Sequence, residues 1–284
     1  MTHGWPAGVE PSQVVSRDGT SIAVFSTGTE GPPLLLVHGT TADHTTWRAT
    51  GPELAHGYRV HAIDRRGRGA SGDAPGDAGY SIELEYDDLA AVADAVAGEA
   101  EVPVDVVGHS YGGRIGLGAA LRTASIARLV VYEGAPSPAG GEGYRPSGVE
   151  DRIASLIEAG DLDAAAQTFF REIVRMPETE LDAYRANPVW PVRAAAVPTS
   201  LREIRAEGSA AASLDELGSV AIPVLQILGG DSAPPFHEAT TALDERLANG
   251  RVVVIAGARH AAHHTHVVEL VGAVRAFLDD PDLT

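Results

Sequence analysis

The stretch Val106-Val107-Gly108-His109-Ser110-Tyr111-Gly112-Gly113 decides the fold. Its two valines end an apolar run typical of a buried strand, and residues 111–122 continue with helical spacing of apolar side chains. A serine on so tight a turn has a strained backbone, and the glycines at 108 and 112 remove side chains that would collide where strand and helix pass. The pattern predicts that the Ser110 hydroxyl projects above the edge of a sheet as a nucleophile.

Short apolar runs and helical patterns alternate on both sides of this turn. Continuous apolar runs such as Pro33–Val37 are typical of strands that are buried on both faces. Strands are predicted over residues 21–27, 33–37, 58–63, 104–107, 127–132, 223–228 and 251–256, the first as the second arm of a hairpin. Helices are predicted over residues 81–97, 111–122, 238–247 and 267–278. The alternation predicts an α/β fold whose mostly parallel central sheet is covered by helices on both faces.

One stretch interrupts the alternation, because no strand pattern appears between Pro136 and Leu217. A Gly- and Pro-rich segment opens it, and helical patterns follow over residues 151–158, 161–174, 178–185 and 199–207. Such an insertion belongs above the ends of the strands, where we expect it to form a helical lid. The predicted division is residues 1–135 for the first part of the core, 136–217 for the lid and 218–284 for the second part of the core.

Charge and composition exclude several classes of function. Lys and Arg number 21 against 39 Asp and Glu, so the net charge is 21 − 39 = −18, and a nucleic-acid partner is not expected. No apolar run has the length of a membrane span, and residues 1–11 lack the pattern of a signal peptide, so we expect a cytoplasmic protein without a membrane partner. The chain has no Cys, which removes thiolate nucleophiles and thiolate metal ligands. Monomer and homodimer both remain open.

Further motifs follow the order of a known family. Leu36-Val37-His38-Gly39-Thr40 is similar to a His-Gly oxyanion loop, and Asp64 to Ser71 is similar to a D-x-R-G-x-G-x-S segment. Gly229-Gly230-Asp231 follows a late predicted strand, and Gly257-Ala258-Arg259-His260 follows the last one. The turn from strand to helix at Gly108 to Gly112, with Ser110 at its tip, is called the elbow here. Together with the elbow, these motifs make nearly the whole chain resemble the α/β-hydrolase fold enzymes, in their serine-nucleophile, esterase and perhydrolase-like branch.

The resemblance implies a set of catalytic residues. Ser110 would attack a carbonyl carbon, His260 would move the proton and Asp231 would orient the imidazole. Glu133, at the end of the strand before the lid, is the alternative acid. The backbone N–H groups of Thr40 and Tyr111 would form the oxyanion hole, to which Thr41 could add its hydroxyl. No cofactor and no metal are implied.

The function expected from this set is acyl chemistry on a small-molecule substrate. We predict a serine hydrolase that cleaves a small or medium carboxylic ester, thioester or lactone through an acyl-enzyme on Ser110. The alternative is the same triad used for acyl transfer, a lyase reaction, C–C bond hydrolysis or cyclisation. A third possibility is a binding protein without turnover. Reactions that need a carboxylate nucleophile are disfavoured, because the elbow carries a serine.

Substrate contacts are predicted from large and polar side chains near the expected site. These candidates are Thr41, Trp47, Phe169, Trp190 and Phe236, and the alternative for each aromatic residue is packing of the lid onto the core. Four histidines between His260 and His266 could resemble a metal cluster, but the H-E-x-x-H pattern is absent, and capping or surface positions are expected for the last three. Asp64, Arg65 and Arg68 are expected to pin a loop by ion pairing rather than to bind an acidic substrate, and His38 to buttress the oxyanion loop.

Overall fold

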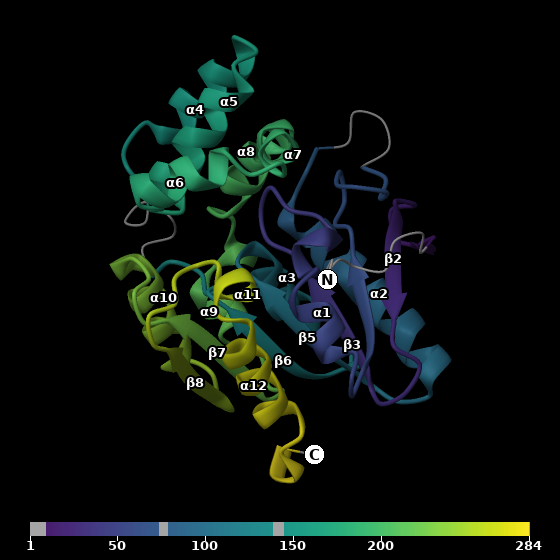
Figure 1. Cartoon of the computed structure of the whole chain (residues 1–284). Coiled ribbons are helices and arrows are strands. Elements are labelled where there is room, and N and C mark those ends of the chain that lie inside the picture. Colours follow the sequence, from purple (N-terminus) through teal and green to yellow (C-terminus); the bar gives the residue numbers. More distant parts are fainter. Residues whose placement is uncertain (1–9, 74–78, 139–144, 284) are drawn as a thin grey trace.

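The computed structural model describes residues 10–73, 79–138 and 145–283 (Figure 1). The predictions for residues 1–9 and for residues 139–144 of the Gly- and Pro-rich segment lie outside these ranges. A sheet of eight strands runs through the molecule in the order β1-β2-β4-β3-β5-β6-β7-β8. The strands are β1 Ser12–Val15, β2 Ser21–Thr27, β3 Pro33–Val37, β4 Arg59–Ile63, β5 Val104–His109, β6 Ile126–Tyr132, β7 Val224–Gly229 and β8 Gly250–Ile255.

The first three strands of this order pair antiparallel and all later neighbours pair parallel. Register in the parallel part places Val37 opposite both Ile63 and Gly108, and it shifts once between β5 and β6, at Val104 and Asp105. Because parallel strands end at one edge of the sheet, the segments that follow β3, β5, β6, β7 and β8 meet there. The predicted mostly parallel sheet is confirmed.

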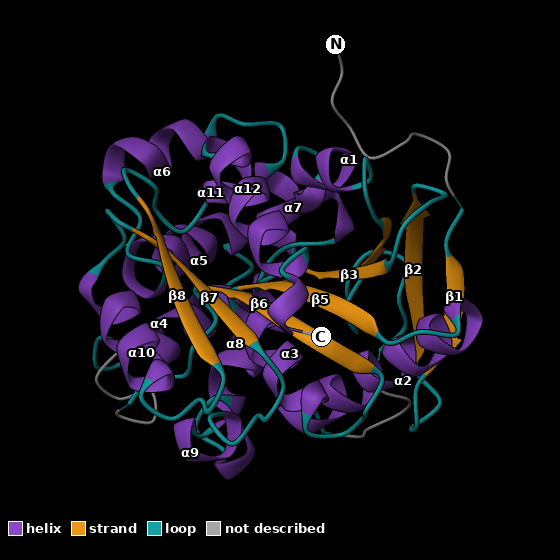
Figure 2. Cartoon of the chain, turned by 90° about the horizontal axis from the view of Figure 1, so that it is seen from below, coloured by secondary structure: helices purple, strands orange, loops and turns teal. Residues whose placement is uncertain are grey.

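Side chains alternate between two apolar layers along each central strand. Leu35 and Val37 contribute to one layer, whereas Leu34 and Leu36 contribute to the other, as the two-residue period of a strand requires. The first layer packs beneath α2 Ile82–Ala100, α3 Tyr111–Ala120, α9 Leu214–Leu217 and α10 Pro234–Asp244, and the second beneath α1 Thr50–Leu54 and α12 Val267–Leu278. Helices therefore cover both faces of the sheet, as predicted (Figure 2).

Helices α4 to α8 form a separate layer, called here the helical layer. They are α4 Val149–Glu158, α5 Leu162–Thr168, α6 Glu178–Arg185, α7 Trp190–Ala195 and α8 Val197–Ala206. These helices bury an apolar cluster of their own and lie at one end of the sheet, above the strand ends in Figure 1. The position matches the one expected for a lid. The division into core and lid, and any movement of the layer, stay predictions.

Two details of the helical layer differ from the sequence prediction. The helix predicted to reach residue 174 ends at Thr168 and continues as a π-helical turn, Phe169–Ile173. Helix α7 was not predicted, because Pro191 and Pro198 suggest helix breaks. In the structure both prolines occupy the first turn of α7 and α8, where a missing N–H leaves no hydrogen bond unmade.

Short elements complete the chain, and among them are 3₁₀ turns His44–Trp47, Ala210–Ala212 and Pro281–Leu283 and helix α11 Ala262–Thr265. Within the described ranges no helix combines the length and the apolar composition that crossing a bilayer requires.

Candidate active site

Ser110 sits between the end of β5 and the start of α3, with φ 54° and ψ −124°. A positive φ is costly for a residue with a side chain, and the surrounding glycines show what holds it there. A Cβ at Gly108 would lie 2.5 Å from the Gly112 carbonyl oxygen, and one at Gly112 would lie 2.3 Å from the Val37 carbonyl oxygen. Strand, turn and helix thus approach too closely for any larger residue, and the structure has the elbow geometry expected from the sequence.

His260 reaches the same edge of the sheet from the loop after β8. Gly257, at φ 75°, turns the chain back toward the sheet. The imidazole Nδ1 lies 2.6 Å from Oε2 of Glu133, and the ring stacks on Phe236 with centroids 4.6 Å apart. The carbonyl oxygen of His260 accepts a hydrogen bond from Nε2 of His109 at 2.8 Å. Neighbouring residues therefore hold both the imidazole and the backbone of His260 in place.

Glu133 occupies the position predicted for the alternative acid. It follows β6 with φ 48°, and its side chain is fully buried. While Oε2 faces His260, Oε1 accepts hydrogen bonds from the Gly229 N–H at 2.7 Å and from the Ser232 hydroxyl at 2.5 Å. Both carboxylate oxygens are thus fixed by partners on the two neighbouring loops.

The assignment of Asp231 as the acid that supports the histidine is corrected by this geometry. Asp231 is exposed, its backbone N–H donates to the Ala258 carbonyl at 2.9 Å, and its side chain makes no hydrogen bond to His260. The Gly229-Gly230-Asp231 turn directs its own backbone, not its carboxylate, toward the buried loop. The space behind the imidazole is occupied by Glu133 from the adjacent strand.

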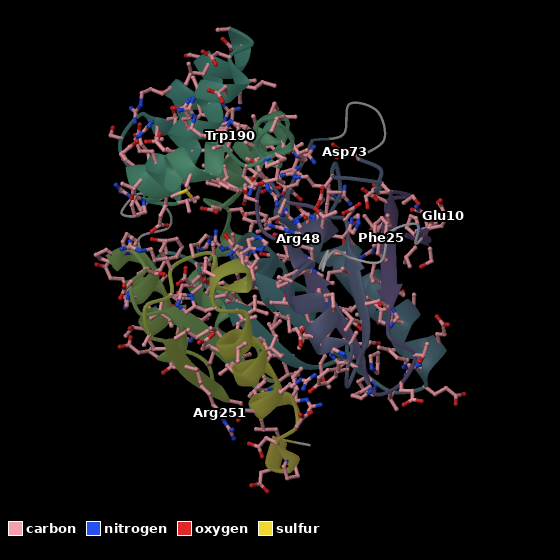
Figure 3. The ribbon with its side chains drawn as sticks, viewed as in Figure 1. Glu10, Phe25, Arg48, Asp73, Trp190 and Arg251 are labelled. Atoms are coloured by element: carbon pink, nitrogen blue, oxygen red, sulfur yellow. The ribbon has the colours of Figure 1, made fainter. Side chains whose placement is uncertain are left out.

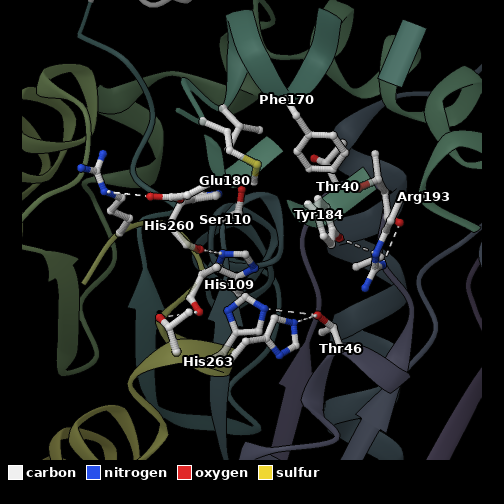
Figure 4. Close-up of a pocket in the computed structure, with 18 of the residues that line it drawn as sticks. Thr40, Thr46, His109, Ser110, Phe170, Glu180, Tyr184, Arg193, His260 and His263 are labelled. Atoms are coloured by element: carbon white, nitrogen blue, oxygen red, sulfur yellow. Dashed lines mark hydrogen bonds and ion pairs between the residues drawn. The ribbon is translucent and has the colours of Figure 1, made fainter. Parts of the chain in front are cut away.

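Ser110 and His260 line one cavity of about 420 Å³ (Figure 4). Their side chains do not hydrogen-bond to each other in the described structure, in which every Ser110 hydrogen bond is made by the backbone. Hydrogen bonds between catalytic groups are often long in unliganded enzymes and tighten when substrate is present. The arrangement places the side chains of Ser110 and His260 at one cavity without a hydrogen bond between them.

The oxyanion loop packs directly against the elbow. A Cβ at Gly39 would lie 3.0 Å from Cβ of Ser110, and Thr40 lines the cavity. The Tyr111 N–H is at the first position of α3, where no intrahelical acceptor exists. The expected buttress is present, since His38 donates from Nδ1 to the Gly39 carbonyl at 2.8 Å and accepts the Arg65 N–H at Nε2 at 3.0 Å.

Most of the predicted substrate contacts lie at the cavity, but two do not. Thr41, Phe169 and Phe236 line it. Trp47 is 0% exposed in the core beneath the sheet edge, and Trp190 is buried inside the helical layer, where its indole N–H donates to Asp163 at 2.6 Å. These two residues are therefore corrected to packing residues, the alternative already open for large aromatic side chains.

Further residues line the cavity beside Thr41, Phe169 and Phe236. The helical layer contributes Phe170, Tyr184, Met176 and Arg193, and the core contributes Arg48. Phe170 and Tyr184 meet edge-on with ring centroids 5.2 Å apart, so the roof above Ser110 is aromatic. Adjacent aromatics at 169 and 170 are a usable signal in the sequence, whereas nothing local marks Arg193 or Arg48.

A group of neutral histidines supports the floor of the cavity. Rings of His109 and His263 lie 4.3 Å apart, and those of His263 and His264 lie 4.1 Å apart. Burial, and then the neighbouring histidines, hold the pKa of His263 well below its usual value, and burial with Arg48 and Arg193 lowers the pKa of His264 to about 3. His263 is buried, contrary to the capping or surface position expected. No group of metal-ligating residues is arranged to hold an ion in the described ranges.

A buried ion network joins the core to the helical layer. Arg65 pairs with Glu85 at 2.7 Å and with Glu203 of α8 at 2.8 Å, and Arg68 pairs with Glu203 at 2.6 Å. The predicted loop-pinning ion pairs are confirmed for Arg65 and Arg68, and their carboxylate partners are now known. Asp64 instead accepts hydrogen bonds from the backbone N–H groups of His44 and Ala70, each at 2.8 Å. Tyr111 touches the same network, because its hydroxyl lies 3.4 Å from the Glu203 carbonyl oxygen and 3.1 Å from the Tyr80 hydroxyl.

Comparison with known proteins establishes the family. Residues 34–273 match the alpha/beta hydrolase family, and the chain belongs to it. Pimeloyl-[acyl-carrier protein] methyl ester esterase of Neisseria meningitidis serogroup A / serotype 4A is 28% identical over 261 residues, which are 87% of this chain and 78% of the relative. An alpha/beta hydrolase from Sphaerobacter thermophilus is 30% identical with a TM-score of 0.77, over 92% of this chain and 99% of that one. Esterase RhEst1 from Rhodococcus sp. shares the fold, with 24% identity and a TM-score of 0.76 over 97% of this chain and 100% of that one.

Proposed function

We propose that this protein is a serine hydrolase of carboxylic esters in which Ser110, His260 and Glu133 act together. The observation that carries the proposal is the 2.6 Å contact from His260 Nδ1 to Glu133 Oε2, beside a serine held at φ 54° in the same cavity. Membership of the alpha/beta hydrolase family and the similarity to an esterase support an ester hydrolase in general. Thioesters and lactones present the same carbonyl chemistry and belong to the proposed range.

In the first half of the reaction, Oγ of Ser110 attacks the ester carbonyl carbon while its proton moves to Nε2 of His260. The carbonyl oxygen becomes an oxyanion, which the N–H groups of Thr40 and Tyr111 stabilise. Collapse of this tetrahedral intermediate breaks the ester C–O bond. His260 returns the proton to the leaving alkoxide, so an alcohol departs and an acyl-enzyme remains on Ser110.

In the second half, water attacks the acyl-enzyme with His260 as the base. The carboxylic acid is released and the Ser110 hydroxyl is restored. Glu133 serves both halves by accepting the Nδ1–H, which keeps Nε2 available for the serine proton and stabilises the imidazolium when it forms. Since both oxygens of Glu133 are already hydrogen-bonded, it holds the ring in one orientation.

Covalent labelling tests the nucleophile directly. A fluorophosphonate should add to Ser110, as read by intact mass and peptide mapping, and Ser110→Ala should abolish both the adduct and hydrolysis of p-nitrophenyl esters of rising chain length. Release of free acid in buffer alone distinguishes hydrolysis from acyl transfer, which requires a second acceptor. Activity that survives Ser110→Ala without any adduct would disprove the proposal.

A further inference from the structure

Arg193 is a buried cation without a carboxylate partner among the residues that the structure describes. Only 3% of it is exposed, although it belongs to α7 of the helical layer. Its Nε donates to the Tyr184 hydroxyl at 2.9 Å and its Nη1 donates to the Thr41 carbonyl at 2.8 Å. Among the described residues, Nη2 makes no hydrogen bond. Two neutral oxygens therefore orient the guanidinium at the wall of the cavity and leave its charge uncompensated.

The other buried arginines behave differently. Arg65, Arg66 and Arg68 are each 4% exposed or less, and each forms an ion pair with at least one carboxylate at 2.9 Å or closer. The chain has 39 acidic residues, so acids are not scarce. An unpaired buried charge is unfavourable, because it has lost its hydration without gaining a counter-charge. A ligand that brings a negative charge would remove this cost, as carboxylates do for the other three arginines.

A second cation lies at the same part of the cavity. Arg48 follows the 3₁₀ turn His44–Trp47, is half-buried, and has no ion pair within the described structure. Figure 3 shows it in the core, beneath the helical layer that holds Trp190. Arg48 and Arg193 both act on His264, whose pKa is lowered to about 3 by burial and by these two charges. The two arginines thus line the same cavity, Arg48 from the core and Arg193 from the helical layer.

The remaining charges at the cavity do not cancel this positive region. Glu180 is the one acidic residue among the described residues that line the cavity, and it pairs with Arg259 at 3.3 Å. Figure 4 shows Glu180 on the His260 side of Ser110 and Arg193 on the opposite side, beyond Thr40. The cavity of a strongly acidic chain is therefore positive at one end.

We propose that Arg193 and Arg48 form a subsite for a carboxylate carried by the acyl part of the substrate. This inference rests on the proposed ester hydrolysis. The leaving-group oxygen must face His260 to receive its proton, so the group that extends away from His260 belongs to the acyl chain. Nη2 of Arg193 supplies a charge-assisted hydrogen bond to the carboxylate, and Arg48 supplies the second positive charge. The favoured substrates are monoesters of dicarboxylic acids.

Two esters of equal chain length test the subsite, p-nitrophenyl hydrogen adipate and p-nitrophenyl hexanoate. We expect kcat/KM to favour the adipate ester by about tenfold or more, because a hydrogen bond to a charged group is involved. Arg48→Gln removes one charge, and Arg193→Gln removes the other while keeping a donor toward the Thr41 carbonyl. Each variant should reduce the preference at least about threefold. Arg205→Gln, which neutralises an exposed arginine of α8, is the matched control and should leave the preference unchanged.

The outcomes separate this inference from the proposed function. Equal kcat/KM for the two esters in the unmodified protein, or a preference that survives in both variants, would overturn the subsite while leaving ester hydrolysis intact. Failure of the proposed function shows instead as no hydrolysis and no labelling of Ser110. In that event calorimetry still decides, because Ser110→Ala protein should bind methyl hydrogen adipate, which carries one free carboxylate, more tightly than the neutral ester methyl hexanoate. Additional Arg48→Gln substitution should reduce the difference, and equal binding of the two esters overturns the subsite.

Discussion

Oε2 of Glu133 lies 2.6 Å from Nδ1 of His260, although 127 positions separate the two residues in the chain. The contact follows from the order of the strands. Glu133 follows β6 and His260 follows β8. The strand between them, β7, ends at Gly229, whose N–H binds the second oxygen of the carboxylate. A carboxylate anchored in this way has one orientation available, and it faces the imidazole.

The first prediction concerns this carboxylate. Glu133→Gln should lower kcat on p-nitrophenyl esters by on the order of 10²–10⁴, because an amide favours the wrong tautomer of His260 and does not stabilise its charged form. Folding can be checked by circular dichroism, and labelling of Ser110 by a fluorophosphonate should slow in parallel.

Asp231→Asn is the matched control for that substitution. Since the Asp231 side chain is exposed and has no contact with His260, kcat should change less than about threefold. A large loss in Asp231→Asn together with an active Glu133→Gln would return the role of supporting acid to Asp231.

The elbow predicts a contrast between two glycine substitutions. Gly112→Ala should destabilise the protein by about 3 kcal/mol or prevent folding, because its Cβ would meet the Val37 and His38 carbonyl oxygens at 2.3 and 2.5 Å. Gly98→Ala, exposed in α2 with no atom within 4 Å of the added Cβ, should stabilise it by about 0.5–1 kcal/mol. Urea denaturation measures both, and equal effects at the two sites would contradict the close-approach argument.

Acid should weaken the fold through the buried histidines. Burial, with Arg48 and Arg193, lowers the pKa of His264 to about 3, below the ordinary value of 6.5 that the unfolded chain has. Between these two values the unfolded state binds more protons, so stability falls as the pH is lowered through that window. One such histidine contributes a slope of about 1.4 kcal/mol per pH unit.

His264→Phe keeps the ring and removes the titration, so the unfolding free energy should depend less steeply on pH between 6 and 4, roughly. His56→Gln is the control, because the His56 side chain is 72% exposed. The slope of that variant should equal that of the unmodified protein. Identical slopes for all three proteins would show that His264 does not resist protonation.

Substitution of Glu203 measures how much the buried ion network contributes to the free energy of unfolding. Glu203→Gln should destabilise the protein by about 3 kcal/mol, because Arg68 loses its carboxylate partner while remaining buried. Asp215→Asn removes a carboxylate from an exposed pair with Arg246 and should change stability by less than about 1 kcal/mol. Urea midpoints that shift equally in both variants would argue against the network as a structural element.

The fold was predictable because its central strands, such as β3, β5 and β7, are buried on both faces. Residues such as Leu34 to Val37 must then be apolar without interruption, and such a short continuous run differs from the spaced apolar residues that predict a helix. The elbow was predictable for a similar reason, since Gly108 and Gly112 are required by backbone contacts under 3 Å. Helix α7 was not predictable, because the sequence alone does not distinguish a proline in the first turn of a helix from a proline that ends one.

A residue of the site was predictable only where its own sequence segment is enough to place it at the sheet edge. Ser110 and His260 each follow a strand and a glycine turn, and their place at the sheet edge follows from that. The choice between Asp231 and Glu133 depends on which side chain points beneath the imidazole, and this is a property of three neighbouring strands. Arg193 shows its significance only through its burial and the absence of an acid among its described neighbours.

The helical layer is attached to both segments that supply the proposed oxyanion donors. Arg193 of α7 binds the carbonyl of Thr41, which follows Thr40 and is held at φ 61°, and α8 presents the Glu203 carbonyl to the Tyr111 hydroxyl. We therefore expect that a displacement of α7 and α8 would disturb both proposed donor segments together with the roof of the cavity. In the proposed mechanism, a molecule opened in this way would lack ordered oxyanion donors and would hydrolyse esters poorly.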